Sequence, residues 1–158
     1  MSSPIHIVQV DVYSPDGSSA INHWVQDIIV DKIPEVDERI YYWVHIRDAE
    51  RALKVLKLHN IQGNFHLSGR RAWNQKMVLD EITMLWNRFQ NALHGTHSIQ
   101  SLSEITSPAA FQVENDRSRP DLSPLHEALI LCGTEGWRPL VPLRVGIMEC
   151  IASVMENS

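Results

Sequence analysis

The chain has 158 residues, of which 44% are hydrophobic and 21% are charged, and these are the proportions of an ordinary globular domain. Nineteen acidic and 14 basic residues give a net charge of -5, so the composition provides no general attraction to nucleic acid or to anionic membranes. The two cysteines, Cys132 and Cys150, are too few for a disulfide framework and lack the pattern of a structural zinc site. With no apolar stretch of membrane-spanning length and no signal-peptide pattern, we expect one cytoplasmic domain with no nucleic-acid or membrane partner.

The first part of the chain predicts a strand, a helix and a second strand. β-branched residues dominate positions 5–12, which is typical of a strand. A turn at residues 14–17 precedes a run of apolar residues at helical spacing, which predicts an amphipathic helix from Ser18 or Ser19 to Ile33. Residues 39–47 are rich in aromatic and β-branched side chains and predict a strand covered on both faces.

The next part repeats this order. Residues 48–59 fit a short helix and an alternating strand equally well, so both interpretations stay open. Residues 65–67 predict a short third strand, and a long helix follows from about residue 72, with Gly95 just past its end. Residues 97–106 predict a fourth strand.

The order of elements predicts an α/β (α+β) fold. Residues 1–106 form tandem β-α-β units, which we expect to make one mixed sheet with two long helices on one face. Residues 107–125 predict a loop or arm, and residues 126–158 a C-terminal helical extension of the same single domain. The apolar face of the helix at 143–155 must dock, so we expect the helix to be ordered and to make an oligomer contact or a lid over the pocket near Glu114. The bare sheet face predicts a homo-oligomer.

One stretch of the sequence resembles a known family. A short strand, a turn at Gly69-Arg70 and a long helix are followed by Ser103-Glu104-Ile105-Thr106 and then by residues 111–117 and Pro120. This order is similar to the second half of the long-chain tautomerase superfamily, near the cis-3-chloroacrylic acid dehalogenase group. The resemblance extends from residue 4 to about residue 120.

The resemblance implies a trimeric, cofactor-free and metal-free enzyme. In that family an N-terminal proline acts as acid or base, arginines hold a carboxylate, and a glutamate moves a proton. Arg70 and Glu114 match the arginine and the glutamate, and Pro4 is closest to the proline. Pro4 is internal, however, and an amide nitrogen cannot be a base.

The residues themselves point to an anion site beside a proton-transferring group. Arg70 and Arg71 precede a long helix, where guanidinium groups can bind carboxylate or phosphate. Glu114 or His66 would move the proton. We therefore expect an isomerase, cyclase or hydratase acting on a small carbonyl or carboxylate compound. The alternative is a non-catalytic binding or scaffold subunit. A remote alternative is a two-histidine phosphoesterase, because His66-Leu67-Ser68 and His94-Gly95-Thr96 imitate its two motifs.

Overall fold

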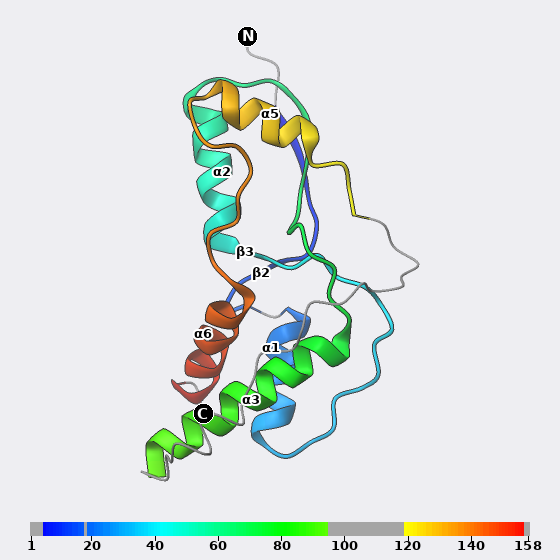
Figure 1. Cartoon of the computed structure of the whole chain (residues 1–158), viewed down its shortest axis with the longest axis vertical. Coiled ribbons are helices and arrows are strands. Elements are labelled where there is room, and N and C mark those ends of the chain that lie inside the picture. Colours follow the sequence, from blue (N-terminus) through cyan, green and yellow to red (C-terminus); the bar gives the residue numbers. More distant parts are fainter. Residues whose placement is uncertain (1–4, 18, 95–118, 157–158) are drawn as a thin grey trace.

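The computed structural model describes residues 5–17, 19–94 and 119–156, and these residues form two lobes around two separate hydrophobic cores (Figure 1). We call the upper part in Figure 1 the sheet lobe, made of β1, β4, α2 and α5. We call the lower part the helical lobe, made of α1, α3 and α6. The short strands β2 and β3 lie where the two lobes meet.

The sheet lobe is built on two parallel strands. β1 (Ile5–Gln9) pairs with β4 (Gly63–Leu67), with Ile5 opposite Gly63 and Gln9 opposite Leu67. The helices α2 (Ile46–Leu58) and α5 (Ser123–Leu131) share one core with these strands. Residues that belong to this buried core include Ala52, Leu56, Phe65, Leu67, Leu125 and Trp137. Alternate side chains of β4 therefore face that core, as the period of a strand requires.

The helical lobe closes around its own core. α1 (Ala20–Ile29), α3 (Gln75–His94) and α6 (Leu143–Glu156) all pack against one another. Their buried residues include Ile21, Trp24, Val25, Val78, Ile82, Ile147 and Ile151. These residues recur at intervals of three and four along each helix, so each helix buries one stripe. The predicted C-terminal helix is therefore ordered, and it docks within its own chain.

The junction between the lobes is a second parallel pair. β2 (Val12–Tyr13) pairs with β3 (Val44–His45), and β3 leads directly into α2. Asp11 has a positive φ of 59° at the break between β1 and β2. Aspartate tolerates this left-handed conformation better than most residues. The break turns the chain from the sheet lobe toward the helical lobe.

The α/β class with parallel strands and helices is confirmed, but the expected sheet is not formed. The described strands make two separate two-stranded sheets instead of one mixed sheet. α1 and α3 pack with α6 and do not form a layer over β1 and β4. The predicted strand at 5–12 breaks at Asp11, and most of the predicted strand at 39–47 is extended chain before α2. Only Tyr41, Val44 and His45 pair as strand residues there.

Other expectations have mixed outcomes. Residues 48–58 are helical, within α2, and His59 follows its last residue. α5 is a helix whose first residues fall in the expected arm at 107–125. The predicted strand at 97–106, Glu114 and Pro4 lie outside the described residues. No helix in the described ranges is both long and apolar enough to cross a membrane.

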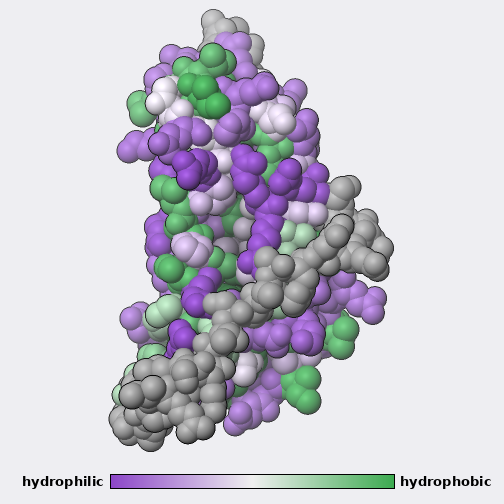
Figure 2. Space-filling view, in the orientation of Figure 1, coloured by the Kyte–Doolittle hydropathy of each residue, from purple (hydrophilic) through white to green (hydrophobic). Residues whose placement is uncertain are grey.

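The surface is mixed in character. Figure 2 shows hydrophobic residues at the top end of the sheet lobe, over α5, among hydrophilic neighbours. The large exposed hydrophobic residues of α5 are Ile130 and Leu131, and Leu131 is 82% exposed. On the far side of the junction, Ile33 and Val36 of the loop after α1 are 90% and 85% exposed.

Candidate functional site

The carboxyl ends of β1 and β4 meet beside the segment 39–43. The Asp11 carboxylate accepts a hydrogen bond from the Tyr42 amide at 2.8 Å and lies 3.7 Å from an Arg39 nitrogen. The Asp11 carbonyl accepts from the Val44 amide at 3.1 Å. These contacts fix segment 39–44 across the end of β1, so that its side chains share one region with those that follow β4.

The turn after β4 packs its backbone directly on that segment. The Gly69 amide donates to the Tyr42 carbonyl at 2.8 Å. A Cβ on Gly69 would lie 2.1 Å from the Trp43 carbonyl oxygen, so only glycine fits at this position. Two further backbone hydrogen bonds join Tyr41 and Trp73, at 2.9 and 2.8 Å. Residues 39–43 and 69–73 therefore form one rigid ledge at the strand ends.

Two arginines lie against aromatic rings on this ledge. The Arg39 guanidinium lies 5.1 Å from the centre of the Tyr41 ring, and that ring stacks on Trp43 at 4.4 Å. The Arg71 guanidinium lies 4.0 Å from the centre of the Trp73 ring. Cation–π contacts of this kind restrain a guanidinium while leaving its N–H groups able to donate. Arg39 and Arg71 are both exposed to solvent.

Arg70 performs a different task from the one expected. Its Nε and Nη2 donate to the Trp137 carbonyl at 3.0 and 2.8 Å, and Nη2 lies 3.4 Å from Nδ1 of His126. The Trp137 indole in turn donates to the Ser68 carbonyl at 2.8 Å, and the Trp137 amide donates to His126 Nδ1 at 3.0 Å. Arg70 therefore fastens the segment after α5 to the end of β4.

A fourth arginine joins the first three from the C-terminal half. Arg119 donates to the Arg70 carbonyl at 3.2 Å. Hydrogen bonds from Ser123 lower the pKa of the neighbouring Asp121 carboxyl, and the charges of His66 and Arg119 lower it further. His66 and Arg119 thus both lie near Asp121. We call Arg39, Arg70, Arg71 and Arg119 the arginine cluster.

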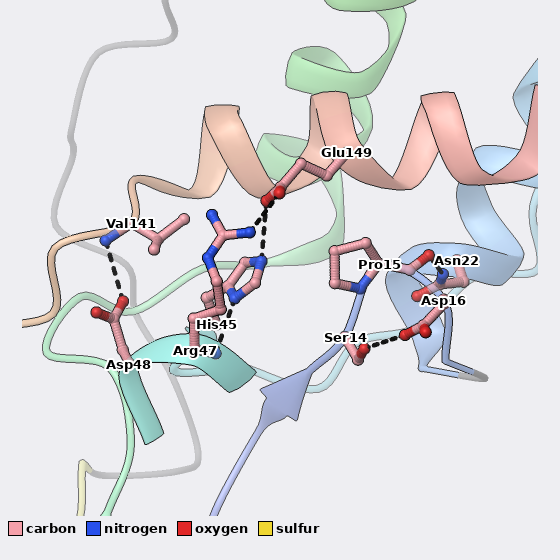
Figure 3. Close-up of polar contacts among 9 residues, drawn as sticks. All are labelled: Ser14, Pro15, Asp16, Asn22, His45, Arg47, Asp48, Val141 and Glu149. Carbon is pink, nitrogen blue, oxygen red and sulfur yellow. Dashed lines mark hydrogen bonds and ion pairs between the residues drawn. The ribbon is translucent and has the colours of Figure 1, made fainter. Parts of the chain in front are cut away.

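A second polar group, at the junction, is structural. Figure 3 shows His45 and Arg47 both directed at Glu149 of α6. His45 Nε2 lies 3.0 Å from the Glu149 carboxylate, while His45 Nδ1 accepts from the Arg47 amide at 3.0 Å. Both ring nitrogens are therefore engaged, and His45 is 1% exposed. This histidine caps α2 and holds α6, and it has no nitrogen left to serve as a base.

Asp48 fastens the same region. Its carboxylate accepts from the Leu140 and Val141 amides at 2.9 and 3.0 Å and pairs with Arg51, as Figure 3 illustrates for Val141. Asp48 also lines a hollow of about 190 Å³ between α2, α5 and residues 134–140, beside Trp137 and Arg138. Because every Asp48 oxygen already has a partner, this hollow has no buried group directed at a ligand.

The structure brings together some of the predicted site residues. Arg70 and Arg71 lie at the strand ends, and His66 is exposed on β4, near Asp121. Glu114 and Pro4 lie outside the described residues, so their roles stay predictions. Of the paired histidine motifs, His66 lies on β4 and His94 is the last residue of α3, while Gly95 and Thr96 lie outside the described residues. Arg39 and Arg119 were missed, because neither is near Arg70 in sequence.

The fold is similar to that of NAD-dependent sugar-nucleotide enzymes. Neither a family profile nor a curated protein sequence matches the chain. A dTDP-glucose 4,6-dehydratase from Bacillus anthracis, solved with NAD, matches with a TM-score of 0.65 and 14% identity, covering 98% of this chain and 45% of the enzyme. A UDP-glucuronic acid 4-epimerase from Bacillus cereus, solved with UDP-glucuronic acid and NAD, matches with a TM-score of 0.62 and 18% identity. The match covers 98% of this chain and 46% of the epimerase.

A third structure agrees with these two. The UDP-glucose 4-epimerase of Thermus thermophilus, in complex with NAD, has a TM-score of 0.57 and 16% identity, over 98% of this chain and 47% of the epimerase. The chain thus spans about half the length of each of these enzymes, and the likeness establishes a partial Rossmann-like fold.

These matches overturn the tautomerase resemblance. Nearly the whole chain superposes on another fold, so the assignment to the tautomerase group is wrong, and with it the expected cofactor-free isomerase, cyclase or hydratase. The phosphoesterase and tautomerase-like scaffold alternatives are dropped for the same reason. The order β-α-β is common to unrelated folds, and the short motifs from residue 65 to 120 fit more than one of them.

The residues present do not fit a bound dinucleotide. Its pyrophosphate needs a glycine-rich turn between a strand and a helix, and the seven glycines nowhere have the spacing Gly-x-Gly-x-x-Gly. The turn after β2 contains Pro15, which has no N–H, and the Asp16 carboxylate. The turn after β4 has the space beside Gly69 filled by the Trp43 carbonyl. We therefore assign no step to NAD on these residues.

Proposed function

We propose that this chain binds a sugar nucleotide and that its arginine cluster holds the diphosphate. The observation that carries the proposal is the placing of Arg39, Arg70 and Arg71 on the two segments at the carboxyl ends of β1 and β4, with Arg119 bonded to the Arg70 carbonyl. In open α/β folds, ligands bind outside the carboxyl ends of the strands. The chain as a whole is acidic, with a net charge of -5, so this cationic cluster is a local feature.

The chemistry of the cluster suits phosphate. A guanidinium group offers parallel N–H donors to phosphate oxygens and is always charged near neutral pH. Arg39 and Arg71 are restrained by the Tyr41 and Trp73 rings, so less rotamer freedom is lost when they bind. Ligands and substrates named for the similar structures, UDP-glucuronic acid, UDP-glucose and dTDP-glucose, all contain a diphosphate between nucleoside and sugar.

The four arginines have two roles in this proposal. Arg39, Arg71 and Arg119 contact the diphosphate, since all three are exposed at the strand ends. Arg70 is a positioning residue, since its guanidinium donates twice to the Trp137 carbonyl and its own carbonyl accepts from Arg119.

Calorimetric titration of the chain with UDP-glucose and with dTDP-glucose tests the proposal. Arg39→Gln, Arg71→Gln and Arg119→Gln should each weaken binding by about tenfold to a hundredfold, because a hydrogen-bonded charge contributes about 1.5–3 kcal/mol. Raising the salt concentration should weaken binding of the unaltered chain.

The matched control is Arg138→Gln. Arg138 is also exposed, but it pairs with Glu135 at 2.9 Å and lines the hollow beside Asp48, so its loss should leave the Kd unchanged. Binding that survives all three cluster substitutions, or that Arg138→Gln weakens equally, would show that the cluster is not the site.

A further inference from the structure

The segment between α5 and α6 is tied to the arginine cluster through one buried tryptophan. Trp137 is 2% exposed, and its carbonyl accepts two hydrogen bonds from the Arg70 guanidinium, at 3.0 and 2.8 Å. Its indole N–H donates to the Ser68 carbonyl at 2.8 Å, directly after β4. The Arg70 carbonyl in turn accepts from Arg119 at 3.2 Å. The position of Trp137 therefore helps to fix two arginines of the cluster.

His126 of α5 holds the backbone of this tryptophan. Its Nδ1 accepts from the Trp137 amide at 3.0 Å, and the Arg70 Nη2 lies 3.4 Å from the same nitrogen. A Cβ on Gly136, which has a φ of +92°, would lie 2.2 Å from Cε1 and 2.4 Å from Nδ1 of the ring. The ring thus fills the space that a side chain at position 136 would need, and this packing keeps Nδ1 directed at Trp137.

This contact requires one protonation state of His126. An amide N–H can donate only to an imidazole nitrogen that carries no proton, so the ring is neutral and its proton is on Nε2. A proton on Nδ1 would remove the acceptor of the Trp137 amide. It would also add a positive charge beside the Arg70 guanidinium. Both changes disfavour the observed arrangement, because a buried donor loses its partner and like charges repel.

The acidic residues on the elements around this ring have contacts of their own. They are Asp48, which pairs with Arg51 on α2, Asp121, which accepts from the Ser123 amide before α5, Glu135, which pairs with Arg138, and Glu127 of α5, which lines a hollow with Phe65. Arg70 is the charged residue whose guanidinium contacts the ring. A protonated His126 would therefore meet another positive charge.

We propose that His126 is a positioning residue of the diphosphate site and that its protonation weakens the binding of a sugar nucleotide. Neutral His126 holds Trp137, Trp137 holds the Arg70 guanidinium, and the Arg70 carbonyl holds Arg119. The affinity for UDP-glucose is thus highest when His126 is neutral. This inference rests on the proposed function, because it takes the arginine cluster as the diphosphate site.

Calorimetric titration with UDP-glucose across the range in which histidine changes charge, about pH 5 to pH 8, tests the coupling. His66→Gln is the background for every measurement, because His66 is exposed near Asp121 and its own proton would attract the diphosphate. We expect the Kd to rise about threefold to tenfold from pH 8 to pH 5, the effect of losing one hydrogen bond.

Three variants at histidines separate this role from a purely structural one. His126→Ala has no acceptor and should bind at pH 8 as weakly as the parent binds at pH 5. His126→Asn provides an amide oxygen near the place of Nδ1 that does not titrate, so it should restore binding and give the same Kd at both pH values. His23→Asn is the control, since His23 is exposed on α1 of the helical lobe, and it should keep the pH dependence of the parent.

Hydrogen exchange of the ligand-free chain reports on the same step without UDP-glucose. The protection factor of the Trp137 amide should fall about threefold to tenfold from pH 8 to pH 5, and it should not fall in His126→Asn. Circular dichroism checks that each variant is folded at both pH values.

Two results would overturn the role of His126 and leave the diphosphate site in place. One is binding through the arginine cluster with the same pH profile in His126→Asn as in its parent. The other is a Trp137 amide that is equally protected at pH 5 and pH 8. Absence of UDP-glucose binding at every pH would instead overturn the proposed function, and the positioning role with it.

Discussion

The two lobes bury comparable sets of apolar residues but differ in how completely they do so. In the helical lobe, three helices surround one core, and their buried stripes face one another. In the sheet lobe, α2 and α5 cover one face of β1 and β4, while the other face is exposed and neither outer edge has a strand partner among the described residues. A helix satisfies its backbone internally, whereas a strand needs a neighbour on each side. Three helices can therefore enclose the core of a small lobe without leaving backbone groups that need a further element to pair with.

The largest effect should come from the contact between the ledge and the strand ends. Gly69→Ala places a Cβ 2.1 Å from the Trp43 carbonyl, and neither backbone can move without breaking the Gly69–Tyr42 hydrogen bond. We expect a loss of at least about 4 kcal/mol of unfolding free energy, or no folded protein. Urea unfolding followed by circular dichroism measures it.

Two glycines elsewhere calibrate that result. Gly146→Ala in α6 meets the buried Tyr13 ring, with the hydroxyl at 1.9 Å and Cζ at 2.6 Å, and should also be costly, but less so because a side chain moves more readily than backbone. Gly133→Ala has a φ of +87° but nothing within 4 Å, and should cost about 1 kcal/mol. Equal losses at positions 69 and 133 would mean that the ledge is not tightly packed.

The next largest effect should come from Asp48 of α2, whose carboxylate binds the segment between α5 and α6. Asp48→Ala removes a buried carboxylate that accepts from the Leu140 and Val141 amides and pairs with Arg51, so three donors lose their acceptor. We expect a loss of about 2–4 kcal/mol in the free energy of unfolding. Asp80→Ala, which removes an exposed carboxylate paired with Lys76, should change stability by less than about 0.5 kcal/mol. A similar effect of both substitutions would contradict the assigned role of Asp48.

A smaller and opposite pair of effects is expected at two tyrosines. The Tyr13 hydroxyl is buried and has no hydrogen-bond partner within the described part of the chain, so Tyr13→Phe should stabilise the protein by about 1 kcal/mol. The Tyr41 hydroxyl donates to Asp37 at 2.6 Å, so Tyr41→Phe should destabilise it by about 1 kcal/mol. Thermal melts of the two variants should move in opposite directions. Loss of stability in Tyr13→Phe would point to a bound water.

The smallest effect is a pH dependence. Burial, and then the hydrogen bond to Asp37, raise the pKa of Tyr41 from 10.0 to about 12. The folded protein keeps this proton at pH values where the unfolded chain loses it. Its contribution to stability is thus complete below pH 10 and is lost as the pH rises from 10 to 12. In a Tyr13→Phe background, the urea midpoint should fall as the pH rises from 10 to 12, and it should fall less after Tyr41→Phe.

The sequence predicted local structure better where the pattern was helical. The helices around Trp24, Ile82 and Ile147 followed from apolar spacing of three and four, although α1 ends at Ile29 rather than Ile33. The lengths of the strands could not be predicted from the sequence. Aromatic and β-branched residues, as at 39–47, occur in buried segments as well as in paired strands. In that segment, the aromatic residues Tyr41 and Trp43 pack in the junction instead.

The candidate site was only partly predictable. Arg70 and Arg71 were visible as a basic pair before a helix, but their different contacts were not. Arg39 and Arg119 join the cluster through Asp11 and through the Arg70 carbonyl, contacts between segments 28 and 49 residues apart in the chain. No local pattern reports such pairings, which depend on where the backbone turns at Asp11 and Gly69.

By itself, the amino-acid sequence determined the α/β class, the three long helices and the buried stripe of each, since these depend on spacing over a few residues. Only the tertiary structure decided the division into two lobes, the parallel pairing of β1 with β4, and the family of folds to which they belong. Strand pairing joins residues such as Ile7 and Phe65, which are 58 positions apart, and its free energy depends on neighbours that no short window of sequence contains.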